Sequence, residues 1–224
     1  MVNLNLTRFR RNVTTDGTFP KKIEEMCAYL SEQKLSLIEL SPDGRINSAL
    51  SESNVLDILK KGFPELTVPN GKSREWYDCA FRDDDGNFIP INIKISTMKS
   101  TPDNVSSKSG LFYTLTGVIP EKEYEWPEYF DKLNENIGKG WDSADYYFIV
   151  INKNDTSDVF CTSQKHLNVL VPNGNNLPFQ CAWGANRIPI YRTNKESKEF
   201  LMGALTESIE RSNEIYQNYH RVFG

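Results

Sequence analysis

The sequence predicts one α/β domain in which a mixed central β-sheet is flanked by helices. Two strand patterns carry this prediction: a hairpin-like segment at 75–95 and a strongly apolar segment at 145–152. Segments with the helical spacing of apolar residues come before, between and after them. Because strands and helices alternate along the chain in this way, we expect a sheet with helices packed on its faces.

Length and composition favour a single soluble unit over residues 1–224. The chain is long enough to bury a large core, 38% of it is hydrophobic, and it contains no internal repeat. No apolar run approaches the roughly eighteen residues of a membrane span, and residues 1–13 lack the apolar segment of a secretory signal. Four widely spaced cysteines without a CxxC pair are typical of reduced thiols, so we expect a cytoplasmic protein.

The amino-terminal part of the chain predicts two helices. Apolar residues recur at helical spacing over about 19–34, and the short apolar run at 35–40 predicts a strand. A Pro-Asp-Gly turn follows. Ser51 or Ser53 is then expected to cap a second helix, which should end near Gly62.

The clearest local feature is a β-hairpin. The segment EWYDCAF predicts its first strand, an Asp-Gly turn follows, and FIPINIKI predicts the second strand. Alternation along this second strand places four isoleucines on one face, which must pack into a core. The opposite face therefore ends in a polar pair, Asn92 and Lys94.

The rest of the chain predicts further elements that complete the sheet and its helical layers. In order, these are a polar loop at 97–109, a helix at 127–137, a central strand at 145–152, a possible neighbouring strand at 158–163, an unassigned segment at 166–192 rich in Asn, Gly and Pro, and a helix over 197–224.

The clearest candidate for a catalytic site consists of Asp78, Asn92 and Lys94. Hydrolysis of a phosphodiester requires a divalent ion that neutralises developing charge and activates a water. Magnesium prefers oxygen ligands, which the Asp78 carboxylate, the Asn92 amide and the backbone carbonyl of Ile93 would supply. Lys94 would then hold the attacking water and stabilise the transition state. We therefore expect a magnesium site between the two hairpin strands.

The predicted hairpin carries Asp78 in its first strand and Asn92-Ile93-Lys94 in its second. With these residues it resembles the core of the PD-(D/E)xK nuclease superfamily over about residues 50–96. The chain departs from the family pattern at Tyr77, where the motif has proline, and at Asn92, which replaces the second acid.

The resemblance also implies a further acid from the helix before the hairpin, for which Glu52 is the first candidate by position and Glu65 the second.

The resemblance implies a restriction-endonuclease-like fold and the activity of a type II restriction endonuclease. Such an enzyme uses Mg²⁺ to cut double-stranded DNA at a short, palindromic site, acts as a homodimer, and has a cognate DNA methyltransferase as its functional partner. Two alternatives stay open. One is a structure-specific repair or junction nuclease on the same core, and the other is a non-catalytic DNA-binding protein with a degenerate site.

Two segments offer candidate DNA contacts. Ser hydroxyls and Lys ammonium groups suit phosphates, and Gln, Asn and Arg suit base edges in the major groove. The alternatives are a surface loop for the first segment and an irregular, core-covering segment for the second. The candidates are Lys99, Ser106, Ser107 and Lys108 in the first segment, and Gln180, Asn186, Arg187 and Arg192 in the second.

Other catalytic or metal-binding patterns are absent from the sequence. Asp83, Asp84 and Asp85 lie in a turn without calcium-loop spacing. His166 and His220 have no partner at zinc-ligand spacing. There is no GxGxxG, P-loop or GxSxG motif, so nucleotide hydrolysis and serine-esterase chemistry are not indicated.

Overall fold

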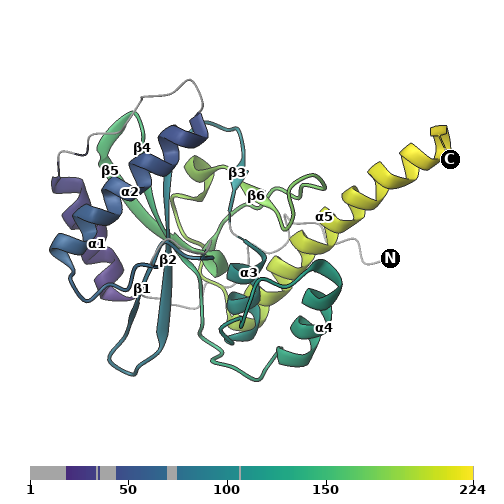
Figure 1. Cartoon of the computed structure of the whole chain (residues 1–224), viewed down its shortest axis with the longest axis horizontal. Coiled ribbons are helices and arrows are strands. Elements are labelled where there is room, and N and C mark those ends of the chain that lie inside the picture. The colour runs from purple at the N-terminus through teal and green to yellow at the C-terminus, as the bar shows by residue number, and fades with distance from the viewer. Residues whose placement is uncertain (1–18, 34, 36–43, 70–74, 106, 224) are drawn as a thin grey trace.

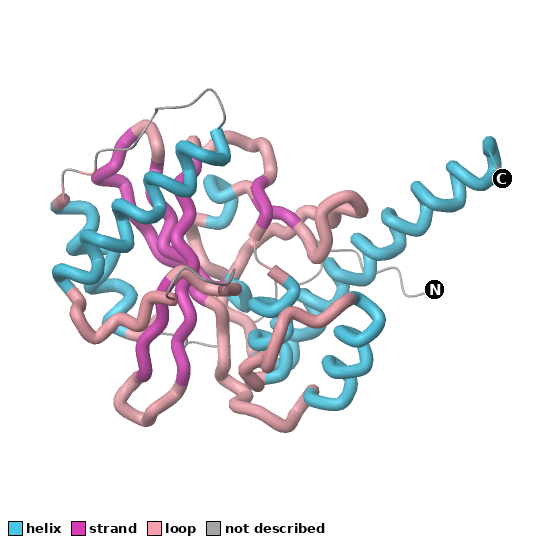
Figure 2. The backbone as a smooth tube through the Cα atoms, in the orientation of Figure 1, coloured by secondary structure: helices cyan, strands magenta, loops and turns pink. Residues whose placement is uncertain are grey.

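The computed structural model describes residues 19–33, 35, 44–69, 75–105 and 107–223. Its centre is a four-stranded mixed sheet with the strand order β1-β2-β4-β5. The β1–β2 and β4–β5 pairs are antiparallel, whereas β2 and β4 run parallel. Helices lie on both sides of these strands (Figures 1 and 2). The predicted class, a mixed sheet flanked by helices, is therefore confirmed.

The amino-terminal half supplies two helices and the hairpin. The elements are α1 (Lys21–Glu32), α2 (Gly44–Gly62), β1 (Cys79–Arg82) and β2 (Phe88–Ser96). Helix α2 begins at Gly44, so the prediction of a cap at Ser51 or Ser53 was wrong, although its end at Gly62 is as predicted. Strand β1 begins one residue after Asp78 and is shorter than predicted. The strand expected at 35–40 lies, apart from Leu35, outside the described residues.

The second half supplies the other two strands of the main sheet and three helices. The elements are β3 (Asp103–Asn104), α3 (Lys108–Thr116), α4 (Trp126–Asn136), β4 (Tyr147–Asn152), β5 (Asp155–Ser163), η2 (Gln164–His166), β6 (Gln180–Cys181), η3 (Trp183–Asn186) and α5 (Asn194–Phe223). The segment predicted as a loop at 97–109 contains β3, which pairs with β6, and the start of α3 at Lys108. The unassigned segment starts at the last residue of η2 and contains β6 and the 3₁₀ helix η3.

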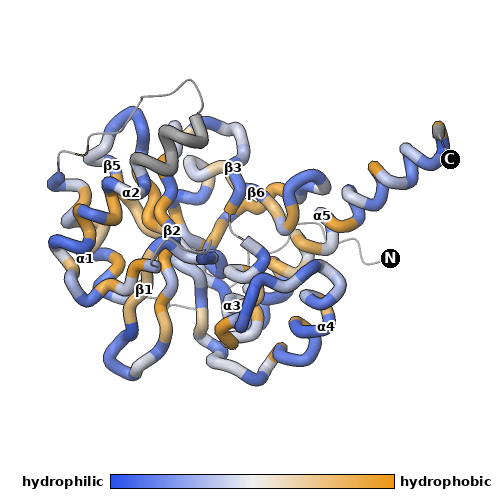
Figure 3. The backbone as a smooth tube through the Cα atoms, in the orientation of Figure 1, coloured by the Kyte–Doolittle hydropathy of each residue, from blue (hydrophilic) through white to orange (hydrophobic). Residues whose placement is uncertain are grey.

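The sheet carries a separate hydrophobic core on each face. The isoleucines of β2 and alternate residues of β4, such as Ile149, pack with α1 and α2. Phe148 and Val150, on the opposite side of β4, pack with α3, α4 and α5. Figure 3 shows the resulting concentration of hydrophobic residues along the central strands. The alternation of β-strand side chains therefore sets which helices cover which face.

The parallel pairing of β2 and β4 fixes the neighbours of the polar pair. Asn92 lies opposite Phe148, and Lys94 lies opposite Val150. Both polar side chains therefore emerge on the side of the sheet that α3 and α5 cover, beside fully buried apolar residues. Of the helices that the structure describes, none combines the length and apolar character needed to cross a bilayer.

Candidate metal centre

Asp78 extends the pairing of the hairpin with its side chain. Its backbone N–H donates to the carbonyl of Ile91 at 2.9 Å, and its Oδ2 accepts from the N–H of Ile93 at 2.6 Å. Along a strand, residues two apart direct their N–H and C=O groups to the same side. The carbonyl of Ile93 therefore points to the side on which the Asp78 carboxylate lies, just beyond the start of β1.

Asn92 presents a buried oxygen that lacks a partner. Its Oδ1 atom accepts no hydrogen bond from the described residues. Its amide nitrogen donates to the hydroxyl of Tyr146, and that hydroxyl donates in turn to the backbone carbonyl of Trp76. A buried polar atom without a partner costs about 1–3 kcal/mol, so an oxygen held in this way is suited to a ligand from outside the chain.

Glu52 reaches the same region from α2. Burial, and next the charge of Asp78, raise the pKa of Glu52 to about 7, while Lys94 acts in the opposite direction. Burial also raises the pKa of Asp78, against the effects of the Ile93 N–H and of Lys94. The two carboxyl groups and the ammonium group therefore lie close enough to influence one another.

Glu65, the second candidate for the additional acid, lies elsewhere. Its carboxylate pairs with Lys22 at 2.9 Å, and its side chain is half exposed. The hydrogen bond from Lys22 lowers the pKa of Glu65. Because the Glu65 carboxylate is paired at the surface, whereas Glu52 is partly buried and within the electrostatic influence of Asp78, the structure favours Glu52 as the additional acid.

These groups fit a hard divalent cation. Two carboxylates, one unpartnered amide oxygen and one backbone carbonyl are the oxygen ligands that Mg²⁺ accepts, and it usually keeps several waters as well. Within the described residues, no group of three or more His, Cys, Asp or Glu side chains is arranged to hold a metal ion. A cation here would therefore depend on Asn92 and Ile93 in addition to the two acids.

The first group of candidate DNA contacts lies around the start of α3. Ser107 caps this helix, with its Oγ accepting from the N–H of Gly110. Lys108 donates to the carbonyl of Tyr124 and lies over the ring of Trp126, 5.3 Å from its centre. Both side chains thus have structural roles that the sequence did not predict.

The other two members of that first group differ from Ser107 and Lys108. Lys99 is exposed, and its side chain is therefore accessible to a phosphate. Ser106 lies outside the described residues.

In the second group, Asn186 and Arg192 are tied into the protein. The amide of Asn186 is fully buried and donates to the carbonyls of Val169 and Ala182, while its oxygen accepts from the Val169 N–H. Arg192 lies 4.0 Å from the centre of the Phe200 ring and donates to two backbone carbonyls. These contacts argue against recognition of DNA bases by either residue. The Asn186 amide is not exposed, and the Arg192 guanidinium already donates hydrogen bonds to the protein backbone.

Gln180 and Arg187 also have partners within the chain. Gln180 accepts from Asn173 at 2.7 Å and donates to Asn104 at 2.9 Å, which links β6 to β3. Arg187 forms a two-fold hydrogen-bonded ion pair with Asp158 at 2.7 and 2.5 Å. A role in DNA recognition would require both residues to exchange these partners, so neither is preorganised for a base edge in this structure.

Sequence reasoning missed the environment of His166. Its Nδ1 lies 2.5 Å from Ser163 Oγ and 3.5 Å from Asp145 Oδ2. A catalytic relay needs the serine and the carboxylate on different ring nitrogens. Here both face the same nitrogen, and Ser163 is fully buried, so the arrangement serves as a structural polar cluster.

Tyr146 is the other residue that sequence reasoning missed. It holds the Asn92 amide, yet in the sequence it reads only as part of an apolar strand segment. Its partners, Trp76 and Asn92, come from distant parts of the chain and meet it only through the parallel pairing of β2 and β4. No local pattern signals such a contact.

Comparison of the chain with protein-family models and with curated proteins finds no match in either. The candidate centre therefore rests on the geometry of its own residues.

Proposed function

We propose that the chain is a magnesium-dependent endonuclease that acts on double-stranded DNA. The observation that carries the proposal is the convergence of four groups at the start of β1: the unpartnered Asn92 oxygen, the Asp78 and Glu52 carboxyl groups, and the Lys94 ammonium group. The proposed metal ligands are Asp78, Glu52, Asn92 Oδ1 and the carbonyl of Ile93.

Each residue has a distinct part in the proposed hydrolysis. A divalent ion bound at these oxygens would lower the pKa of a water and neutralise charge on the phosphate. Lys94 would orient the attacking water and stabilise the negative charge that develops on the phosphate oxygens. Asp78 is fixed by its bond to the Ile93 N–H, and Asn92 by Tyr146, so little reordering is needed when substrate binds.

The fold is compatible with a restriction-endonuclease-like core. A helix precedes the antiparallel hairpin, and a helical crossover then leads to β4, which is parallel to β2. On this basis we propose a type II restriction endonuclease, which would act as a homodimer on a short palindromic site beside a protecting methyltransferase. Lys99 is the described candidate best placed for a phosphate contact, because it is exposed near the end of β2.

Cleavage of phage DNA with magnesium and with chelator tests the activity. We expect discrete fragments that require magnesium, and Lys94→Ala should reduce the cleavage rate by at least about a hundredfold while leaving DNA binding nearly unchanged. The matched control is Lys60→Ala, which removes an exposed lysine of α2 and should cleave as the wild type does. Loss of binding together with cleavage in Lys94→Ala would contradict its role on the water.

The same assay separates the alternatives. Cleavage of branched DNA but not of linear duplexes would indicate a structure-specific nuclease on this core. Intact DNA across several substrates, with binding retained, would contradict catalysis and leave the non-catalytic DNA-binding protein.

A further inference from the structure

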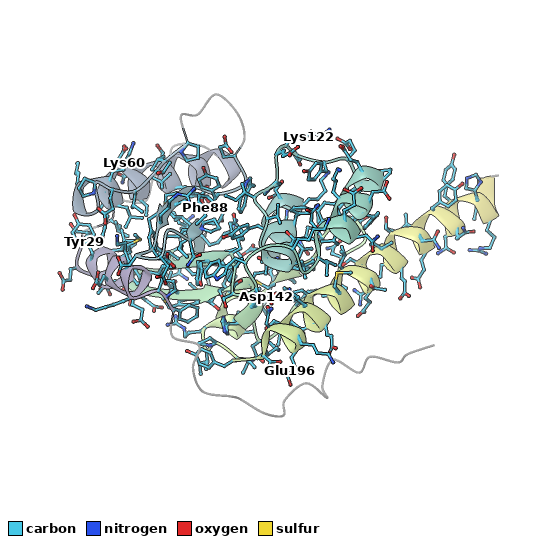
Figure 4. All side chains as sticks on the ribbon, turned by 90° about the horizontal axis from the view of Figure 1, so that it is seen from below. Tyr29, Lys60, Phe88, Lys122, Asp142 and Glu196 are labelled. Carbon is cyan, nitrogen blue, oxygen red and sulfur yellow. The ribbon has the colours of Figure 1, made fainter. Side chains whose placement is uncertain are left out.

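Two of the four cysteines meet where α1 packs on β5. Cys27 lies on the buried face of α1, and Cys161 lies in β5, the last strand in the order of the main sheet. Both residues belong to the same hydrophobic core, and their thiols are joined by a hydrogen bond. Figures 1 and 4 show α1, which carries Tyr29, beside the strands of this sheet. The fold therefore brings two thiols into contact that are far apart in the sequence.

The remaining cysteines have different surroundings. All four cysteines lie within the described part of the chain, and all four are free thiols. Cys79 in β1 and Cys181 in β6 are fully buried, and neither has another cysteine among the groups that shift its pKa. These two residues therefore serve as internal controls for any reaction that depends on a pair of thiols.

The two paired thiols differ in access and in acidity. Cys27 is only 7% exposed, whereas Cys161 is partly exposed. The hydrogen bond from Cys27 lowers the pKa of the Cys161 thiol, against the effects of burial and of Glu24. The same contact, followed by burial, raises the pKa of Cys27 far above its usual range. Because the thiolate is the reactive form of cysteine, Cys161 is placed to react first while Cys27 keeps its proton.

We propose that Cys27 and Cys161 form a reversible disulfide when hydrogen peroxide oxidises the folded protein, and that this bond ties α1 to β5. This inference does not rest on the proposed nuclease activity, because it depends only on the contact between these two elements. Thiols that already share a hydrogen bond need only a small approach to reach the S–S bond length of about 2.05 Å.

The oxidation proceeds in two steps. The Cys161 thiolate first attacks one oxygen of the peroxide, so that an S–O bond forms, the O–O bond breaks and hydroxide leaves to combine with the proton that Cys161 released. The Cys27 sulfur then attacks the Cys161 sulfur. The S–S bond forms, the S–O bond breaks, and the departing hydroxide takes the Cys27 proton and leaves as water. Two thiols and one peroxide thus give one disulfide and two waters, and a reducing thiol such as dithiothreitol reverses the reaction.

Peptide mapping by mass spectrometry tests the pairing. The folded protein is treated with hydrogen peroxide, its remaining thiols are alkylated in denaturant, and it is digested without reduction. We expect one linked pair of peptides, which contains Cys27 and Cys161 and disappears after dithiothreitol, while Cys79 and Cys181 are alkylated as in the untreated protein. Four free thiols after treatment, a link that involves Cys79 or Cys181, or Cys161 oxidised to a sulfinic acid beside a free Cys27 would each overturn the proposal.

Thermal unfolding tests whether the bond fits the folded protein. Because the link closes a long stretch of chain, the oxidised wild type should unfold at a temperature higher by roughly 5–15 °C, and dithiothreitol should abolish the increase. Cys161→Ser should unfold at the same temperature with and without peroxide. The matched control is Cys181→Ser, which removes a thiol from β6 and should keep the peroxide-dependent increase even if the substitution itself costs stability. An increase that persists in Cys161→Ser, or a linked wild type that shows none, would contradict a disulfide between α1 and β5.

Discussion

The raised pKa of Glu52 makes stability and metal binding at the candidate centre depend on pH. Its pKa, raised from 4.5 to about 7 mainly by burial and then by Asp78, means that the folded protein holds a proton that the unfolded chain releases. That proton stabilises the fold at low pH, and its contribution is lost as pH rises from 4.5 through about 7. A cation requires the carboxylate form, so metal binding should strengthen over the upper part of the same range.

We therefore expect magnesium affinity to increase as pH rises through about 7, with release of a proton from Glu52. Calorimetric titration in two buffers of different ionisation enthalpy measures that release. Glu52→Gln should bind magnesium more weakly, release no proton near neutral pH, and lose less stability than the wild type as pH rises. An unchanged proton release in Glu52→Gln would place the titrating group elsewhere.

Substitutions at Asn92 and at Tyr146 test the proposed metal ligand separately from the residue that holds its amide in place. Asn92→Asp supplies the acid that the family motif has at this position, so it should retain or strengthen magnesium binding. Tyr146→Phe removes the hydroxyl that holds the amide and should weaken binding by roughly tenfold. The control is Tyr113→Phe, which removes a different buried hydroxyl, bonded to the Phe88 carbonyl in the same aromatic cluster. It should cost stability but not affinity. Complete loss of binding in Asn92→Asp would place Asn92 outside the metal ligands.

At the scale of elements, the hairpin was the part that the sequence predicted best. Alternating isoleucines and an Asp-Gly turn are local signals, and both act within a few residues. The first strand was nevertheless predicted too long, because beyond the backbone bond of Asp78 to Ile91 the next bond to β2 is accepted by the Asp78 carboxylate and not by a backbone carbonyl. The departure from regular pairing is therefore located at a candidate functional residue.

Elements whose stability depends on distant contacts could not be predicted. Helix α3 was missed because it is buried on almost every side, so its sequence lacks the alternation of polar and apolar faces that reveals a surface helix. Strands β3 and β6 have two residues each and pair with one another, and Gln180 of β6 also pairs with Val171. The same reason applies to Asn186. The hydrogen bonds of its buried side-chain amide depend on where the backbone of Val169 lies in the folded chain.

At the scale of the whole molecule, β4 belongs to both hydrophobic cores. Its alternate side chains pack with α1 and α2 on one face and with α3, α4 and α5 on the other, whereas β2 contributes its isoleucines to the first of these cores. The candidate centre lies where β1 stops short of the full length of β2, between these two packed layers. Disturbance of either core should therefore reach β4, the parallel neighbour of the strand that carries Asn92 and Lys94.

The place of β4 in both cores predicts that the chain unfolds as one unit. Phe148 and Ile149 are fully buried neighbours on opposite faces of β4, so Phe148→Ala and Ile149→Ala each open a cavity in a different core. Each should lower the free energy of unfolding by roughly 2–5 kcal/mol. In denaturant, tryptophan fluorescence and far-ultraviolet circular dichroism should report coincident transitions for the wild type and both variants. If Phe148→Ala shifted one signal and Ile149→Ala only the other, the two faces would be separate folding units and the prediction of a single domain would be wrong. Coincident shifts would mean instead that the central strands couple the two cores, so that the groups of the candidate centre keep their positions only while both cores are intact.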